Sequence, residues 1–185
     1  MAYTRVNWEN LPSTNTPRNA TNLNIMDEGL FNQDARITTV ENTLKSNCIV
    51  VSKTTDYTTL STAEEKLPLD LVSEKTGDKL SLVSNGVLIG AGVSKVKVSS
   101  NVMYSTIPAE GLGGIHANNI YLNTTKISET AVRPSDAYPS VSNASKMISV
   151  SEGDTIFLYV RSSGVSGSVV RGGSTYTNLT VEVVE

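Results

Sequence analysis

The most constraining feature of this chain is a seven-residue repeat of apolar side chains in residues 22–47. At heptad position a the repeat places Leu23, Leu30, Ile37 and Leu44. Three residues after each of these, at position d, it places Met26, Gln33, Val40 and Asn47. Two such series form the seam along which helices pack into a coiled coil. We therefore expect a helix of about 26 residues, roughly 39 Å long, that packs against copies of itself.

An amphipathic helix lying on the chain's own sheet is the alternative, but such helices usually show a broader apolar stripe. Gly29 and the threonines that follow it lower the intrinsic helix propensity, so this helix needs a partner. Gln33 and Asn47 at d positions cost stability but fix the register, because polar core residues pair best with their own copies. The seam does not determine the number of helices.

Residues 48–185 show the period of two that is typical of half-buried strands. Val96, Val98, Ser100, Val102 and Tyr104 alternate with polar residues, which predicts a strand with Tyr104 in the core. Similar alternation surrounds residues 156–160 and 179–183. Asn-Gly in the segment Ser84-Asn85-Gly86 predicts a β-hairpin, because it supplies the two positive-φ residues of a type I′ turn. Many short strands without a helical pattern predict a mainly β fold, a sandwich or jelly roll.

Composition excludes several classes of function. A pI of about 5.2 and the absence of a basic run argue against nucleic-acid binding. No stretch approaches 18 apolar residues, so we expect no membrane insertion, and the first twenty residues lack the apolar core of a secretory signal. One cysteine, Cys48, excludes an internal disulfide framework, and one histidine, His116, leaves little for a metal centre. We expect no cofactor and no metal.

Motifs that carry catalysis are absent: there is no phosphate loop, no H-E-x-x-H, no G-x-S-x-G and no C-x-x-C. His116 follows the glycine-rich segment 111–114, and serines and aspartates are plentiful, so a triad remains possible in principle. An exposed or hydrogen-bonded loop histidine is the interpretation we favour. We therefore expect the chain not to be an enzyme.

The remaining candidate contact residues lie at the surface and in the N-terminal segment. Tyr138, in the loop 134–139, is the tyrosine that we most expect to be exposed. Together with Asp136 and His116 it forms our candidate receptor contact. Residues 1–21 are polar and turn-rich and are expected to form an extended arm, with Trp8 and Leu11 as candidate anchors in a larger assembly. The alternative is an arm that docks on the protein's own helix or trimer.

Two segments resemble known proteins. Trp8-Glu9-Asn10 and the run TPRNATNLNIMDEGL at residues 16–30 resemble the start of fibre and baseplate proteins from phages of Gram-positive bacteria, where such a run leads into a short coiled coil. Residues 67–185 resemble the jelly-roll heads of the tumour-necrosis-factor and complement globular-head type. The resemblance rests on GAGVSKVKVS at 90–99, VSEGDTIFLYV at 150–160 and YTNLTVEVVE at 176–185.

These resemblances imply a parallel homotrimer with four parts: an anchoring arm at 1–21, a coiled-coil stalk at 22–47, a connector at 48–66 and a jelly-roll head at 67–185. They imply a virion protein, made in the bacterial cytoplasm and not secreted through a signal peptide. Its arm would bind other virion proteins, and its head would bind the host cell surface, often through saccharide. Gln33 and Asn47 would then meet on the threefold axis. The alternatives are a purely structural virion component and, from another class, a depolymerase of host polysaccharide.

Overall fold

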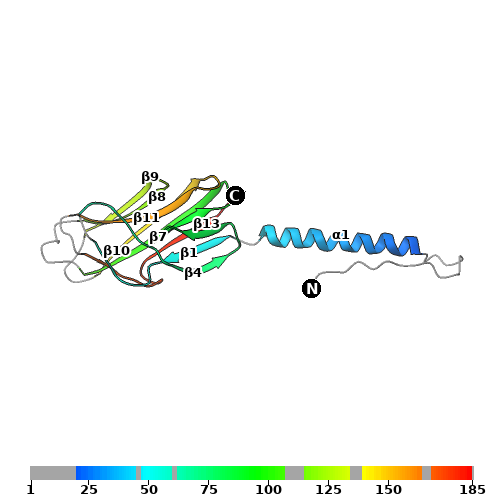
Figure 1. Ribbon diagram of the computed structural model, residues 1–185, viewed down its shortest axis with the longest axis horizontal. Coiled ribbons are helices and arrows are strands. Elements are labelled where there is room, and N and C mark those ends of the chain that lie inside the picture. Colours follow the sequence, from blue (N-terminus) through cyan, green and yellow to red (C-terminus); the bar gives the residue numbers. More distant parts are fainter. Residues whose placement is uncertain are drawn as a thin grey trace. The chain divides into compact units, whose positions relative to one another are not determined.

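The structure is a computed structural model that describes residues 20–44, 47–59, 62–106, 115–133, 139–163 and 168–184, with helix side chains described for 25–37. The chain divides into two compact units, Met1–Lys45 and Ser46–Glu185. The first contains the helix α1, Ala20–Leu44. This helix covers most of the segment that the heptad repeat assigns to the stalk, and it ends three residues before Asn47 (Figure 1).

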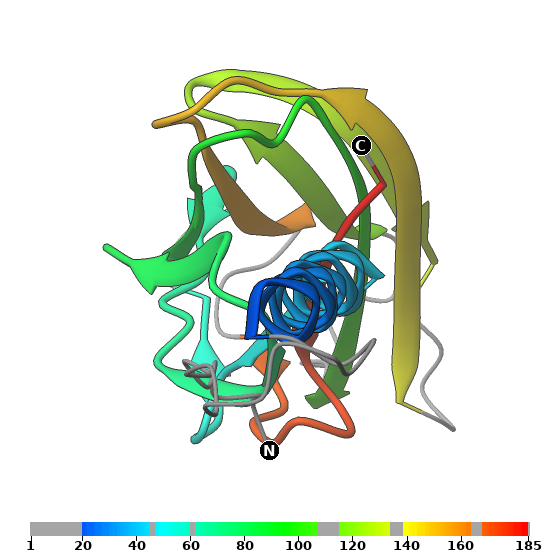
Figure 2. The ribbon, with the colours of Figure 1, turned by 90° about the vertical axis from the view of Figure 1, so that its right-hand side faces the viewer.

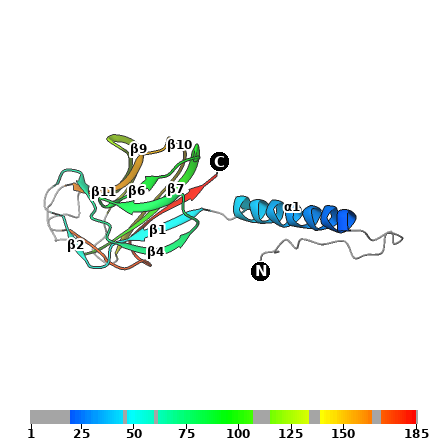
Figure 3. The ribbon, with the colours of Figure 1, turned by 45° about the vertical axis from the view of Figure 1, so that its right-hand side comes forward.

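The second unit is a β-sandwich of two antiparallel sheets, and this confirms the mainly β jelly-roll prediction (Figures 1 and 3). The strands of the seven-stranded sheet are β1 (Cys48–Ser52), β2 (Tyr57–Thr58), β4 (Leu71–Thr76), β7 (Lys95–Thr106), β10 (Ser140–Ser149), β12 (Val169–Val170) and β13 (Asn178–Val183). The strands of the six-stranded sheet are β3 (Glu65–Lys66), β5 (Leu80–Val83), β6 (Gly86–Ile89), β8 (Ile115–Leu122), β9 (Thr125–Val132) and β11 (Thr155–Ser163).

Strand order places β7 at the centre of the first sheet and β11 at the centre of the second. The first sheet runs β2-β12-β7-β13-β1-β4, with β10 on the other side of β7. The second runs β5-β6-β11-β8-β9, with β3 beside β11. In Figure 2, β10 is the long yellow strand at the outer edge. Strands of the two sheets are thus interleaved along the chain, and most pairs join segments that are far apart in sequence.

The core lies between the two sheets and follows the alternation that the sequence predicts. On β7, every second residue from Val96 to Tyr104 is buried, and Tyr104 is fully covered. Ile156, Leu158 and Val160 on β11 face the same interior. The apolar core is therefore built from alternate residues of both sheets, as expected for a sandwich.

The described residues of the expected connector, 48–59 and 62–66, are part of the sandwich itself. Ile49 and Val51 of β1 are fully buried, and β1 pairs with both β13 and β4. Glu65 and Lys66, at the end of the expected connector, form β3 and are half-buried. The boundary expected at residue 67 is therefore wrong, because β2 and β3 are two-residue strands that carry no periodic signal of their own.

The hairpin between β5 and β6 is confirmed, but its turn is one residue earlier than expected. Ser84 and Asn85 carry the positive φ angles, 46° and 67°, and Gly86 is the first residue of β6. A Cβ atom at Gly86 would lie 2.5 Å from Cδ1 of Phe157 and 2.8 Å from the carbonyl oxygen of Ile156. Glycine is thus needed there for close packing against β11.

Gly86→Ala is expected to lower the free energy of unfolding of the sandwich by about 1–3 kcal/mol, because the added methyl group forces Phe157 or the β11 backbone to move. Chemical denaturation at a fixed protein concentration measures this loss. Gly29→Ala is the control, since a Cβ atom there meets nothing within 4 Å and alanine favours a helix. Equal effects of the two substitutions would contradict the packing argument.

Candidate functional site

The helix α1 exposes three of the apolar side chains that the heptad repeat places at its seam. Met26, Leu30 and Ile37 are 66%, 52% and 56% exposed in the single chain, and Gln33 is exposed between them. Leu23, Val40 and Leu44 lie in the same helix. An exposed apolar row on a helix of weak intrinsic propensity is typical of a helix that is completed by a partner.

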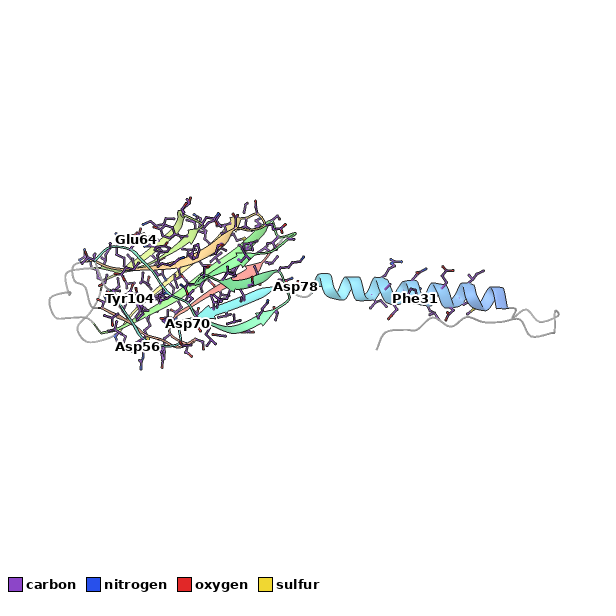
Figure 4. All side chains as sticks on the ribbon, in the orientation of Figure 1. Phe31, Asp56, Glu64, Asp70, Asp78 and Tyr104 are labelled. Carbon is purple, nitrogen blue, oxygen red and sulfur yellow. The ribbon has the colours of Figure 1, made fainter. Side chains whose placement is uncertain are left out.

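Two further exposed apolar residues on α1, Ile25 and Phe31, fall outside the seam (Figure 4). In the heptad they occupy positions c and b, which lie on the opposite side of the helix from a and d. The heptad repeat does not identify them, because it consists only of the residues that recur at a and d. An apolar residue at an outer heptad position is the signal that would have identified them.

Asn47 is not part of the helix, so its assignment to the stalk core is wrong. Its Oδ1 atom accepts hydrogen bonds from the backbone N–H groups of Asp78, at 3.1 Å, and Lys79, at 3.2 Å. A Cβ atom at Gly77 would lie 1.9 Å from this oxygen, and Gly77 also has a positive φ of 70°. Asn47 therefore stabilises the turn between β4 and β5.

His116 is only 1% exposed, so it cannot contact a receptor from the surface in this conformation. Its Nδ1 atom lies 2.7 Å from Oγ of Ser140, and its Nε2 atom lies 3.2 Å from Oγ of Ser168. The ring stacks on Tyr104, with centroids 3.9 Å apart and an angle of 17° between the planes. Burial lowers the pKa of His116 to about 4, which keeps the imidazole neutral near pH 7.

Tyr104 of β7 connects this cluster to the backbone of two strands of the opposite sheet, β8 and β11. Its hydroxyl donates to the carbonyl oxygens of Ala117, at 2.9 Å, and Arg161, at 3.3 Å. Burial raises the pKa of Tyr104 well above its usual value. The sequence predicted Tyr104 in the core, and this is confirmed; its contact with His116 had no sequence signal.

The remaining predicted site residues lie outside the described residues: Trp8, Leu11, Asp136 and Tyr138. Among the residues that the structure describes, no group of three or more His, Cys, Asp or Glu side chains could hold a metal ion. No described helix is long and apolar enough to cross a membrane.

The outward face of the seven-stranded sheet is polar, with a few apolar side chains on its edge strand β10. Val141 and Met147 are 44% and 59% exposed, between inward-facing serines and alanine. Next to them, the register aligns Asn143 with Asn101 and Ser145 with Ser99.

The outward face of the six-stranded sheet carries an aromatic and ionic cluster. The rings of Tyr121 and Tyr159 lie 4.3 Å apart, and the Tyr121 hydroxyl donates to Glu64. Lys126 forms ion pairs with Glu64 and, at 2.8 Å, with Glu129. Desolvation opposes ionisation of Glu64, but hydrogen bonds from Lys126 and Tyr121 outweigh it and lower its pKa. The cluster therefore holds the segment before β3 against the sheet (Figure 4 labels Glu64).

Comparison with solved structures finds the same sandwich in other proteins. A crystal structure of murine APRIL at pH 8.5 matches 76% of this chain and 100% of its own, with a TM-score of 0.59 and 8% identity. The sandwich has a tumour-necrosis-factor-like fold. Eiger TNF from S. frugiperda matches 76% of this chain and 94% of its own, with a TM-score of 0.58 and 7% identity. At such low identity the likeness concerns the fold alone.

Comparison of the sequence with protein-family models and with curated proteins finds no match. The similarity to these two structures agrees with the resemblance of residues 67–185 to jelly-roll heads of the tumour-necrosis-factor type.

Proposed function

We propose that this chain is the subunit of a homotrimeric bacteriophage fibre whose TNF-like sandwich attaches to the host cell surface. The observation that carries the proposal is the exposed row Met26, Leu30 and Ile37 on a helix that precedes a TNF-like sandwich in the chain. Such a row leaves water when identical helices associate, at about 25 cal/mol per Å² of buried apolar area. The phage-type motif at residues 16–30 supports the fibre context.

Trimerisation is the first part of this proposal. The stalk brings three copies of Gln33 to the axis, where each amide hydrogen-bonds to the others and fixes the register. The outward face of the seven-stranded sheet, with Val141 and Met147 on its edge, suits contact between the three sandwiches. Sedimentation equilibrium should give about three times 19.7 kDa. A monomer at micromolar concentration would refute the stalk.

Anchoring and attachment complete the proposal. Residues 1–21, with Trp8 and Leu11, bind other virion proteins, and the sandwich binds host cell-wall saccharide without catalysis. Asp136 and Tyr138 remain the candidate contacts from the sequence, in the segment between β9 and β10.

Fluorescently labelled full-length protein is expected to bind host cells saturably, and purified cell-wall polysaccharide should compete. The polysaccharide should keep its length during incubation, because a shortened polymer would indicate a depolymerase. An Asp136→Ala, Tyr138→Ala double variant tests the contact, with Thr175→Ala on the exposed turn before β13 as the control. If no candidate host binds the protein, and phage lacking the sandwich adsorb normally but are less stable, the chain is a structural virion component.

A further inference from the structure

His116 and the two serines that its ring contacts each follow a different connection of the sandwich. His116 is the second residue of β8, after the connection 107–114. Ser140 begins β10, after the connection that includes 134–138, and Ser168 directly follows 164–167. The His116 ring lies within hydrogen-bond distance of both serines, through its two different nitrogen atoms. The ring therefore ties the starts of three strands to one point.

This cluster also links the two sheets. His116 belongs to the six-stranded sheet, whereas Ser140 lies in the seven-stranded sheet and Ser168 precedes its strand β12. The Ser168 hydroxyl lies 2.6 Å from that of Ser162 on β11, and the Tyr104 ring from β7 covers one face of the imidazole. The four side chains that contact the ring or one of its two serines are all buried: Tyr104, Ser140, Ser162 and Ser168. Breaking the cluster therefore loosens both layers at this end of the sandwich.

The two hydrogen bonds can be satisfied by a neutral ring. A neutral imidazole has one N–H donor and one acceptor nitrogen, so one serine accepts from the ring and the other donates to it. A protonated ring has two donors, so the serine that donates to the neutral ring would have to turn its hydroxyl and accept instead. No described carboxylate contacts the ring. The described side chains that face it are Tyr104 from β7, Ser140 from β10 and Ser168 next to β12, with Ser162 from β11 behind Ser168.

Of the described side chains that contact the His116 ring, Tyr104 is the titratable one, and burial keeps it neutral because it raises the pKa of its hydroxyl. Arg161 of β11 supplies its backbone carbonyl to Tyr104, while its guanidinium binds Glu129 on the outward face. A charge on the ring would therefore be buried without a counter-ion among the residues that the structure describes, which is strongly unfavourable.

We propose that His116 is a positioning residue that holds these three strand starts together while it is neutral, and that its protonation in acid releases them as a local unit. This goes beyond attachment to a host and does not depend on it. The device is an acid-sensitive clamp at the end of the sandwich from which β8, β10 and β12 begin.

The difference in the pKa of His116 between the closed and open states gives the direction and size of the change in the opening equilibrium. In the closed state burial lowers the pKa of His116 to about 4, and in the open state the exposed ring returns to its ordinary pKa of 6.5. The open state thus binds more protons between these two values, so the opening constant rises as pH falls through this window. With a tenfold change per pH unit, the total increase is up to about 300-fold.

The single histidine makes the test direct, because labelling histidine with ¹³C in the full-length protein gives ring signals from His116 alone. We expect these signals to keep the neutral form down to about pH 5. Amide hydrogen exchange, corrected for the intrinsic rate, should accelerate together at 115–117, 140–141 and 168–170 between pH 7.5 and pH 4. Exchange at Val98 and Val181 in the core should stay slow.

His116→Phe is the matched variant, since it keeps a buried ring that cannot be protonated, and its exchange at the three segments should lose the pH dependence. Ser128→Ala on β9 serves as a control that retains it. A ring that titrates near 6.5 in the folded protein, or exchange that accelerates equally in the core, would overturn the proposal. If His116→Phe does not fold, the wild-type ring titration and exchange series still decide between these outcomes.

Discussion

Ile37→Asp is expected to convert the assembly into monomers. Ile37 lies at a central a position and is 56% exposed in the single chain, so the proposed stalk would bury three copies at one level. Three aspartates there would place like charges together without partners, at a cost of several kcal/mol for each ion. The sedimenting mass should fall from about three times 19.7 kDa to that of one chain. The helical circular dichroism signal should fall with it, because the isolated helix is marginal.

The control for this experiment is Asn32→Asp, which adds the same charge to the same helix at position c. It should leave the mass and the helical signal unchanged, because position c faces away from the seam. If Ile37→Asp also leaves both unchanged, the exposed row is not packed in a homotrimer. The alternative of an amphipathic helix lying on a sheet would then be favoured.

Tyr104→Ala is expected to destabilise the sandwich most strongly among single truncations. Tyr104 is fully buried, its ring stacks on His116, and its hydroxyl donates to the carbonyl oxygens of Ala117 and Arg161. Truncation leaves a large cavity, and large aromatic-to-alanine changes in cores cost about 3–5 kcal/mol. Loss of the two hydrogen bonds adds about 1–3 kcal/mol, so many molecules would unfold at 37 °C. Urea denaturation at fixed protein concentration measures the change.

Tyr104→Phe separates the ring from the hydroxyl, since it keeps the packing and removes only the donor. We expect it to lose about 1–2 kcal/mol, less than half of the alanine effect. Tyr176→Ala is the surface control, because Tyr176 is exposed and its ring stacks on the Arg171 guanidinium at 4.5 Å. A loss at Tyr176 as large as at Tyr104 would contradict the role assigned to the buried cluster.

Asn47 illustrates where sequence periodicity fails. The heptad repeat extends to residue 47 as a pattern of letters, but the helix ends at Leu44. The oxygen of Asn47 finds better partners in the turn at residues 77–79, some thirty positions later. A repeat gives no information on such a contact, since it compares residues only with their near neighbours in the chain.

His116 shows the same limit at the other end of the sandwich. Its position after a glycine-rich segment favoured a loop histidine, but it lies in β8 with its partners 24 and 52 residues away. Neither Ser140 nor Ser168 carries a pattern that points to histidine. Only the pairing of β8 with β11, and the packing of one sheet on the other, brings them together.

The sequence by itself determined the local elements: the helix with its apolar row, the alternating strands around 96–104 and 156–160, the hairpin at 84–86 and the mainly β class. These follow from periods of 3.6 and two and from turn chemistry, which act between residues close in the chain. The tertiary structure decided the boundary of the sandwich, the burial of His116 and the role of Asn47. Each of these depends on strand pairs and hydrogen bonds between residues far apart in sequence, and no local pattern encodes them.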